Sequence, residues 1–130
     1  MSGSVEVGID VVDVDRLASA LGRRPALAER LFTDHERDSR ARGARAVQRL
    51  AARLAAKEAT MKALGVGLGA FALRDVEVRT AADGRPTLQL HGAADALARD
   101  RQVRSLAVSL SHTATVATAV VVAETACAPS

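Results

Sequence analysis

The stretch RLAARLAAKEATMKALG, residues 49–65, decides the fold class because it predicts one long helix that must be buried. Leucine and alanine recur here at three- and four-residue intervals, the pattern of an amphipathic helix. On a helical wheel, Glu58 falls on this apolar face, within about 20° of the direction of Val47. Burying a carboxylate without a partner costs several kcal/mol. Glu58 therefore needs a cation beside it or a raised pKa. The apolar positions of this face are Val47, Leu50, Ala51, Leu54, Ala55 and Met61.

Two kinds of cation suit Glu58. Lys62 lies four residues further on, and an exposed pair at this spacing contributes only about 0.3–0.5 kcal/mol. The alternative is Mg²⁺, which binds one or two protein carboxylates and keeps sites for water and substrate phosphate. Asp10 is the second carboxylate that we expect beside Glu58, although Asp13 and Asp15 compete for the role.

The remaining patterns predict a single α+β domain over residues 1–130, with 125–130 as a loose tail. Residues 5–12 alternate in polarity, which predicts a strand with Asp10 opposite its core face. The segment TVATAVVVAE, residues 115–124, is apolar on both faces and predicts a central strand. The core face of the first strand is expected to carry Val5, Val7, Ile9 and Val11. Further strands are expected at 74–80, 86–91 and 103–112, with helices near 13–21, 25–31, 34–42, 44–64 and 93–100.

Composition narrows the function classes. The chain has two phenylalanines and neither tryptophan nor tyrosine, so aromatic platforms for stacking bases are nearly excluded. No apolar run is long enough to span a membrane, and the polar start does not resemble a signal peptide. Cys127 is the one cysteine, which favours a reducing, cytoplasmic setting. We therefore expect neither a nucleic-acid nor a membrane partner.

Arginine is concentrated in residues 16–53, whereas the formal net charge of the whole chain is only +3. Such a region attracts a nucleic acid, an anionic protein or a phosphorylated ligand, or it is simply a solvated face. The arginines are Arg16, Arg23, Arg24, Arg30, Arg37, Arg40, Arg42, Arg45, Arg49 and Arg53.

Two short segments could bind an anion but are also explained structurally. The GVGLG segment has glycines at 65, 67 and 69, yet it follows a helix, where the dipole is negative, rather than preceding one. It is expected to be a helix stop and loop. His112 ends a strand in SLSHT, where it is a candidate phosphate ligand or acid–base group, or has a structural role.

Taken together, these segments resemble the holo-acyl-carrier-protein synthases, the short 4′-phosphopantetheinyl transferases. The resemblance covers about Val7 to Glu124 and is most specific where the Asp10 and Glu58 segments occur together. The segments, in order, are VGIDVVDVDRL, LFTDHE, ARLAAKEATMKALG, DGRPTL and VSLSHTATVATAVVVAE. The resemblance implies an antiparallel sheet packed against one long helix and short helices, in a homotrimer whose active sites lie between subunits.

The resemblance also implies a reaction and its residues. The 4′-phosphopantetheine group of coenzyme A passes to a serine of an apo acyl carrier protein, with release of 3′,5′-ADP. Asp10 and Glu58 would bind Mg²⁺, Lys62 would stabilise the leaving diphosphate, and either Glu58 or a water on the metal would take the serine proton. Coenzyme A would be bound by Arg53, Lys62, Gly65, Gly67, His112 and Thr113. The acidic carrier would be bound by Arg16, Arg23 and Arg30.

The sequence departs from the family pattern at three positions, Ala26, Thr60 and Ala107. They put in doubt one contact in the pocket and the details of carrier choice and interface packing, but leave the two carboxylates intact. Two rival interpretations remain at this point: a basic module that binds nucleic acid without coenzyme A, and an inactive relative with a structural role.

Overall fold

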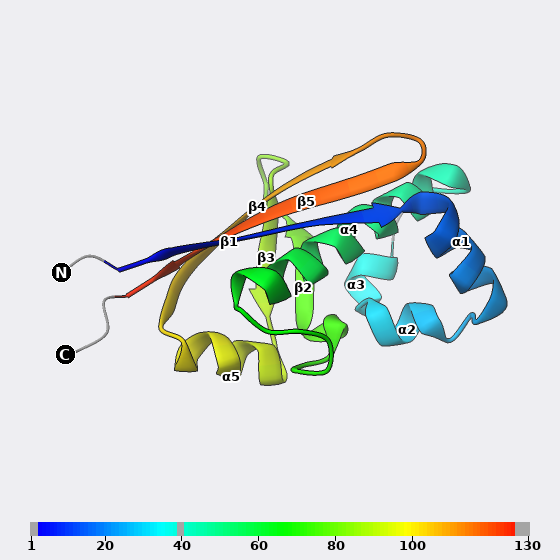
Figure 1. Cartoon of the computed structure of the whole chain (residues 1–130). Helices are drawn as coiled ribbons and strands as arrows, with labels where there is room; N and C mark the ends of the chain where they lie inside the picture. Colours follow the sequence, from blue (N-terminus) through cyan, green and yellow to red (C-terminus); the bar gives the residue numbers. More distant parts are fainter. Residues whose placement is uncertain (1–2, 39–40, 127–130) are drawn as a thin grey trace.

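The computed structural model describes residues 3–38 and 41–126. Three long strands lie over a central helix, short helices gather at one end, and a two-stranded hairpin passes behind the helix in this view (Figure 1). The fold is the small α+β arrangement with antiparallel sheets that the sequence predicts. Its elements are β1 (Val5–Asp13), α1 (Val14–Arg23), α2 (Leu27–Leu31), α3 (Asp34–Arg37), α4 (Ala44–Ala63), η1 (Leu73–Asp75), β2 (Val76–Thr80), β3 (Pro86–Leu90), α5 (Gly92–Asp100), β4 (Val103–His112) and β5 (Val116–Thr125).

The larger sheet has the strand order β1-β5-β4, and both pairings are antiparallel. The strand predicted to be central, β5, is indeed flanked on both sides. The smaller sheet is the hairpin β2-β3, which turns at Asp83–Gly84 as expected. Helix α4 packs against all three strands of the larger sheet and also against β2. It is therefore buried on more than one side, and the single apolar stripe seen in the sequence describes only part of its environment.

The predicted core face of β1 is wrong. Gly8, Asp10 and Val12 point toward α4, because Gly8 lets the backbone of β1 lie directly against Ala59 of α4. The alternating apolar side chains point the other way and are 59–62% exposed in the single chain. This outer apolar face consists of Val5, Val7, Ile9 and Val11.

Several local signals for helix ends are confirmed, but the helix expected over 34–42 ends already at Arg37. Asp13 caps α1, its carboxylate accepting a hydrogen bond from the backbone N–H of Arg16 at 2.9 Å. Thr33 and Glu36 form the expected capping box at α3. After α4, Gly65 has φ +72°, a left-handed conformation that glycine adopts without strain.

Thr125 and Ala126, which the sequence analysis places at or next to a loose tail, are hydrogen-bonded to the rest of the fold. Thr125 ends β5 and donates a hydrogen bond from its backbone N–H to the carbonyl of Ser4, and Ala126 N–H donates to the carbonyl of Gln102. Residues 127–130, including Cys127, lie outside the described residues. Within the described chain, no helix combines the length and apolar character needed to cross a bilayer.

Candidate active site

Asp10, Glu58 and Lys62 come together where β1 crosses α4. The Lys62 ammonium donates hydrogen bonds of 2.9 Å to Asp10 Oδ1 and to the carbonyl of Ile9. Lys62 thus pairs with Asp10 across the two elements rather than with Glu58 along the helix. The Asp10 and Glu58 carboxyl groups border one cavity and lie close enough for each to shift the pKa of the other. The sequence predicts this meeting of Asp10 and Glu58, although it places Asp10 on the wrong face of β1.

The electrostatics of the Asp10 and Glu58 carboxyl groups favour binding of a cation. Burial and the neighbouring Asp10 carboxylate raise the pKa of Glu58 to about 8, against the opposing effect of Lys62. Burial also acts to raise the pKa of Asp10, but its interactions with Glu58 and Lys62 outweigh this and leave the pKa below its ordinary value. Two adjacent carboxyl groups resist being ionised together, and a bound cation relieves that repulsion.

A divalent cation fits this pair of carboxyl groups. Asp10 Oδ2 is buried and has no hydrogen-bond partner in the described part of the chain. Asp10 and Glu58 have no third His, Cys, Asp or Glu beside them among the described residues. Two carboxylates with room for further oxygen ligands suit Mg²⁺, which keeps positions for water and substrate phosphates.

Glu58 separates two cavities. One, of about 300 Å³, also contains Asp10, Lys62 and Gly67 in its wall. The other, of about 560 Å³, is an apolar groove between α1, α2 and α4 with Arg16 at its edge. A carboxylate that borders both spaces can contact two different molecules at once.

The other candidate residues for coenzyme A lie apart from this pair. Gly65 borders a third cavity, of about 610 Å³, which Lys62 shares. His112 is exposed, and Thr113 shapes the turn by accepting hydrogen bonds from the N–H groups of Thr115 and Val116. His112 shares the face of Asp10 but lies two strands away, about 10 Å in interstrand spacing. Within one chain, these residues do not converge on Glu58.

Arg53 lines yet another cavity, of about 700 Å³, together with Arg49 and Arg85. Arg53 is 6% exposed, and burial together with repulsion from Arg49 lowers its pKa to about 10, against the attraction of Glu36. The Nε groups of both Arg49 and Arg53 are buried with no hydrogen-bond partner within the described residues. Buried guanidinium groups with unused donors favour an anion such as phosphate. The family resemblance assigns Arg53 to coenzyme A, but it assigns no ligand to Arg49 or Arg85.

Of the carrier-binding candidates, Arg16, Arg23 and Arg30 are all exposed on α1 and α2. Arg16 borders the apolar groove beside Glu58. Arg23 ends α1 and Arg30 lies in the last turn of α2. The three arginines therefore lie along neighbouring helices at one end of the molecule (Figure 1).

The three departures from the family pattern have different surroundings. The hydroxyl of Thr60 is buried and donates to the carbonyl of Ala56 at 2.7 Å, so α4 accommodates it internally. Ala107 is exposed on β4 and borders the arginine cavity. Ala26 precedes α2 without a side-chain cap.

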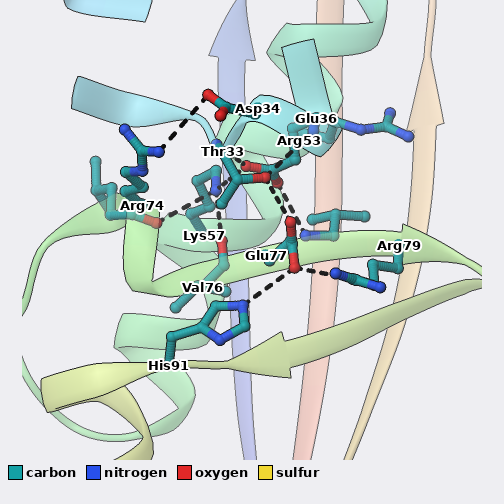
Figure 2. A network of polar contacts seen from close by, with 12 residues as sticks. Thr33, Asp34, Glu36, Arg53, Lys57, Arg74, Val76, Glu77, Arg79 and His91 are labelled. Carbon is teal, nitrogen blue, oxygen red and sulfur yellow. Dashed lines mark hydrogen bonds and ion pairs between the residues drawn. The ribbon is translucent and has the colours of Figure 1, made fainter. Parts of the chain in front are cut away.

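A buried polar network next to the site was not anticipated (Figure 2). Lys57 and Glu36, both fully buried, form an ion pair of 2.7 Å. Glu77 lies close by and accepts hydrogen bonds from Thr33 at 2.6 Å and Arg79 at 2.8 Å. The sequence identified the Thr33–Glu36 capping box, but nothing in the spacing of these residues indicates that Lys57 closes the network from another element.

This network makes an acid-sensitive contribution to stability. Burial alone would raise the pKa of Glu77, but hydrogen bonds from Thr33, Arg79 and His91 outweigh it and lower the pKa to about 2. A depressed carboxyl pKa stabilises the fold above the unfolded-state value near 4.5, and this stabilisation is lost as pH falls toward 2. We expect Glu77→Gln to lower the free energy of unfolding at pH 7 by up to about 3 kcal/mol.

Urea denaturation of Glu77→Gln and the unmodified protein at pH 7 and pH 3 measures this contribution. The difference in the free energy of unfolding between the two proteins should be smaller at pH 3 than at pH 7. A difference that stays constant over this range would contradict the assignment to Glu77.

Comparison with known proteins agrees with this geometry. The sequence profile of the 4′-phosphopantetheinyl transferase superfamily matches residues 6–120. A holo-[acyl-carrier-protein] synthase of Salinispora arenicola is 48% identical over 120 residues, covering 92% of this chain and 98% of the relative. One of Streptomyces coelicolor is 49% identical over 120 residues, covering 92% and 97%. The crystal structure of such a synthase from Bacillus anthracis in complex with coenzyme A (3′,5′-ADP) matches with a TM-score of 0.79 at 31% identity, covering 96% of this chain and 100% of that one. This similarity over nearly the whole length confirms the resemblance, and the chain belongs to the 4′-phosphopantetheinyl transferase superfamily, among the holo-[acyl-carrier-protein] synthases.

Proposed function

We propose that this protein transfers the 4′-phosphopantetheine group from coenzyme A to a serine of an apo acyl carrier protein, in a Mg²⁺-dependent reaction that releases 3′,5′-ADP. The observation that carries the proposal is the position of Glu58 between two spaces. On one side lies the cavity of Asp10 and Lys62, suited to a metal and a diphosphate. On the other lies the apolar groove next to Arg16, suited to an acidic carrier protein.

The chain's own residues supply most of the chemistry. Asp10 and Glu58 would hold Mg²⁺, which would supply positive charge to the diphosphate and orient it for attack. The serine oxygen forms a bond to the β-phosphorus, and the bond from that phosphorus to the 3′,5′-ADP oxygen breaks. Glu58 takes the serine proton, and Lys62, whose side chain is 55% exposed, offsets the negative charge that develops on the leaving oxygen.

We propose that coenzyme A is bound between copies of the chain in a homotrimer. The outer apolar face of β1 is uncovered in the single chain, at the edge of the larger sheet. This favours burial of that face against another copy of the chain. Within one chain, neither Arg53 nor His112 lines a cavity that Glu58 borders, and a neighbouring copy would bring such residues to the same ligand. The unused donors of Arg53 favour the phosphates of coenzyme A, with Gly65, Gly67 and Thr113 along the rest of the molecule.

Assembly through the outer apolar face predicts a substitution that separates the copies. Ile9→Glu places a charge on a side chain that is 59% exposed in the single chain, so it should leave the monomer folded but prevent burial of this face. Light scattering after size-exclusion chromatography should give a monomer and binding of coenzyme A should be lost. Gln89→Glu, at an exposed position on β3, is the control and should remain a trimer. A trimer in the Ile9→Glu variant would contradict this role of β1.

Carrier recognition predicts a selective effect of charge reversal. Arg16→Glu should raise the KM for an acidic carrier about tenfold or more at low salt, because charges at an interface act mainly on encounter and register. The dissociation constant for coenzyme A should stay unchanged, and the effect should shrink as salt rises. Equal weakening of both ligands would instead indicate misfolding. Arg23 and Arg30 are proposed to contribute in the same way.

The decisive experiment is mass spectrometry of an apo acyl carrier protein incubated with this protein, coenzyme A and Mg²⁺. The carrier should gain one phosphopantetheine group, and EDTA should prevent the gain. No gain on several apo carriers, with the protein shown to be folded, would contradict the proposal. Salt-sensitive binding to duplex DNA without any transfer would favour a nucleic-acid-binding module instead. We propose a cytoplasmic location as well, because a single cysteine is typical of a protein of a reducing compartment.

A further inference from the structure

All three N–H groups of the Lys57 ammonium have hydrogen-bond acceptors inside the protein. It is fully buried, and its three protons have three acceptors: Glu36 Oε1 at 2.7 Å, the carbonyl of Leu73 at 3.2 Å and the carbonyl of Val76. The ammonium also lies 5.5 Å from the centre of the Phe32 ring. Helix α4 is thereby tied to η1 and β2 by one side chain, and Figure 2 shows Lys57 within this network.

Glu36, the partner of Lys57, is equally constrained. Its Oε1 also accepts from the backbone N–H of Thr33 at 2.9 Å, and its Oε2 accepts from the backbone N–H of Val78 at 2.9 Å. The carboxylate therefore connects the start of α3, the strand β2 and the helix α4. Because the anchors of this ion pair are backbone groups at the start of α3, in η1 and in β2, the ammonium of Lys57 has one defined position.

The face of α4 toward the larger sheet offers little to fix the rotation of the helix. Its buried side chains there are small, and Gly8 of β1 adds none. Small side chains form shallow ridges, which interlock weakly with a neighbouring surface. The buried alanines of α4 are Ala51, Ala52, Ala55, Ala56, Ala59 and Ala63.

Rotation of α4 matters because Glu58 follows Lys57 directly. The Glu58 carboxylate lies about 6 Å from the helix axis, so a rotation of about 20° displaces it by about 2 Å. A shift of that size separates Glu58 from Asp10, since hydrogen bonds and metal ligation tolerate only tenths of an ångström. We propose that Lys57 is a positioning residue: its buried ion pair with Glu36 fixes the rotation of α4 and so places the Glu58 carboxylate beside Asp10. This role rests on the proposed function of the Asp10–Glu58 site.

Energetics support a positioning role over a purely stabilising one. A buried ion pair gains little over an apolar pair of the same shape, because both charges lose their hydration. Its directional hydrogen bonds, in contrast, specify one geometry. Replacing both members together should therefore alter the position of Glu58 more than it alters the stability of the fold.

The test combines Glu36→Gln with Lys57→Met, which removes both charges and keeps similar side-chain volumes. Binding of Mn²⁺, followed by electron paramagnetic resonance as a probe of the carboxylate site, should weaken about tenfold or more. In the transfer assay, kcat should fall and the KM for Mg²⁺ should rise, while the KM for coenzyme A stays within about twofold. Glu36→Gln alone is the milder variant, with a smaller loss in the same direction, and serves if the double variant does not fold.

Leu88→Ala on β3 is the matched control, because it removes core volume beside the same small sheet and leaves the ion pair intact. It should lower stability without weakening Mn²⁺ binding. Wild-type Mn²⁺ affinity in the folded Glu36→Gln/Lys57→Met variant, or an equal loss in Leu88→Ala, would overturn the proposal. Since Mn²⁺ binding is measured without a carrier, a protein that binds the metal but transfers nothing would contradict the proposed function and leave this inference standing.

Discussion

Glu58→Gln is expected to reduce phosphopantetheine transfer by at least about a thousandfold while the protein stays folded, because the amide neither ligates Mg²⁺ well nor accepts the serine proton. Both losses act on the same step, so kcat should fall far more than the KM for either substrate changes. Steady-state assays with saturating Mg²⁺ measure the effect. Mn²⁺ binding measured separately should weaken as well.

Stability gives this prediction an internal control. The pKa of Glu58 is raised to about 8, so the folded state favours the protonated form, and stability is lost as pH rises from about 4.5 through 8. Glu58→Gln removes that loss, and without metal the variant should be at least as stable as the unmodified protein at pH 8. A thermal melt shows whether this holds. Full transfer activity in the variant would refute the role of Glu58, whereas lower stability would mean that the carboxylate has a structural partner.

The sequence predicts the fold in most of its elements, because the signals for those elements are local. The periodicity of residues 44–64, the doubly apolar strand near 115–124 and the Asp83–Gly84 turn are all found in the structure. The inward face of β1 is the exception. An alternating strand normally buries its apolar side, but here Gly8 allows α4 to approach closely on the polar side. The apolar side is left exposed and available for contact with another molecule. An alternating sequence pattern does not show whether the apolar side is buried in the chain's own core or against another molecule.

The sequence predicts the central residues of the candidate site but not the residues that hold them in position. Asp10, Glu58 and Lys62 are recognisable because charged groups fall on segments that are otherwise apolar. Lys57 and Glu36 are not, because their pairing joins residues 21 positions apart and each has an ordinary local explanation. Glu36 completes a capping box, and Lys57 is one more lysine on a helix. Only tertiary structure shows that both are fully buried.

Gly8→Ala is expected to destabilise the fold by about 3 kcal/mol or more, a large share of the 5–15 kcal/mol typical of a domain. A Cβ atom at this position would lie 1.9 Å from the carbonyl oxygen of Ala59 and 2.7 Å from the backbone nitrogen of Ala63. Both obstacles are helix backbone, so no side chain can rotate away. Either β1 or α4 must move, and the hydrogen bond from Lys62 to the carbonyl of Ile9 lies next to the displaced residue.

Gly22→Ala is the matched control for the same chemical change. Gly22 lies in α1, and a Cβ there meets no atom within 4 Å. Alanine favours a helix over glycine, so this variant should be more stable by about 0.5–1 kcal/mol. Urea denaturation of both variants at pH 7 separates the steric effect from the general effect of adding a methyl group. A change of less than about 0.5 kcal/mol in Gly8→Ala, within the usual range for a surface substitution, would mean that β1 and α4 can separate without cost. In that case, close contact between the two backbones would no longer explain why Asp10 faces Glu58.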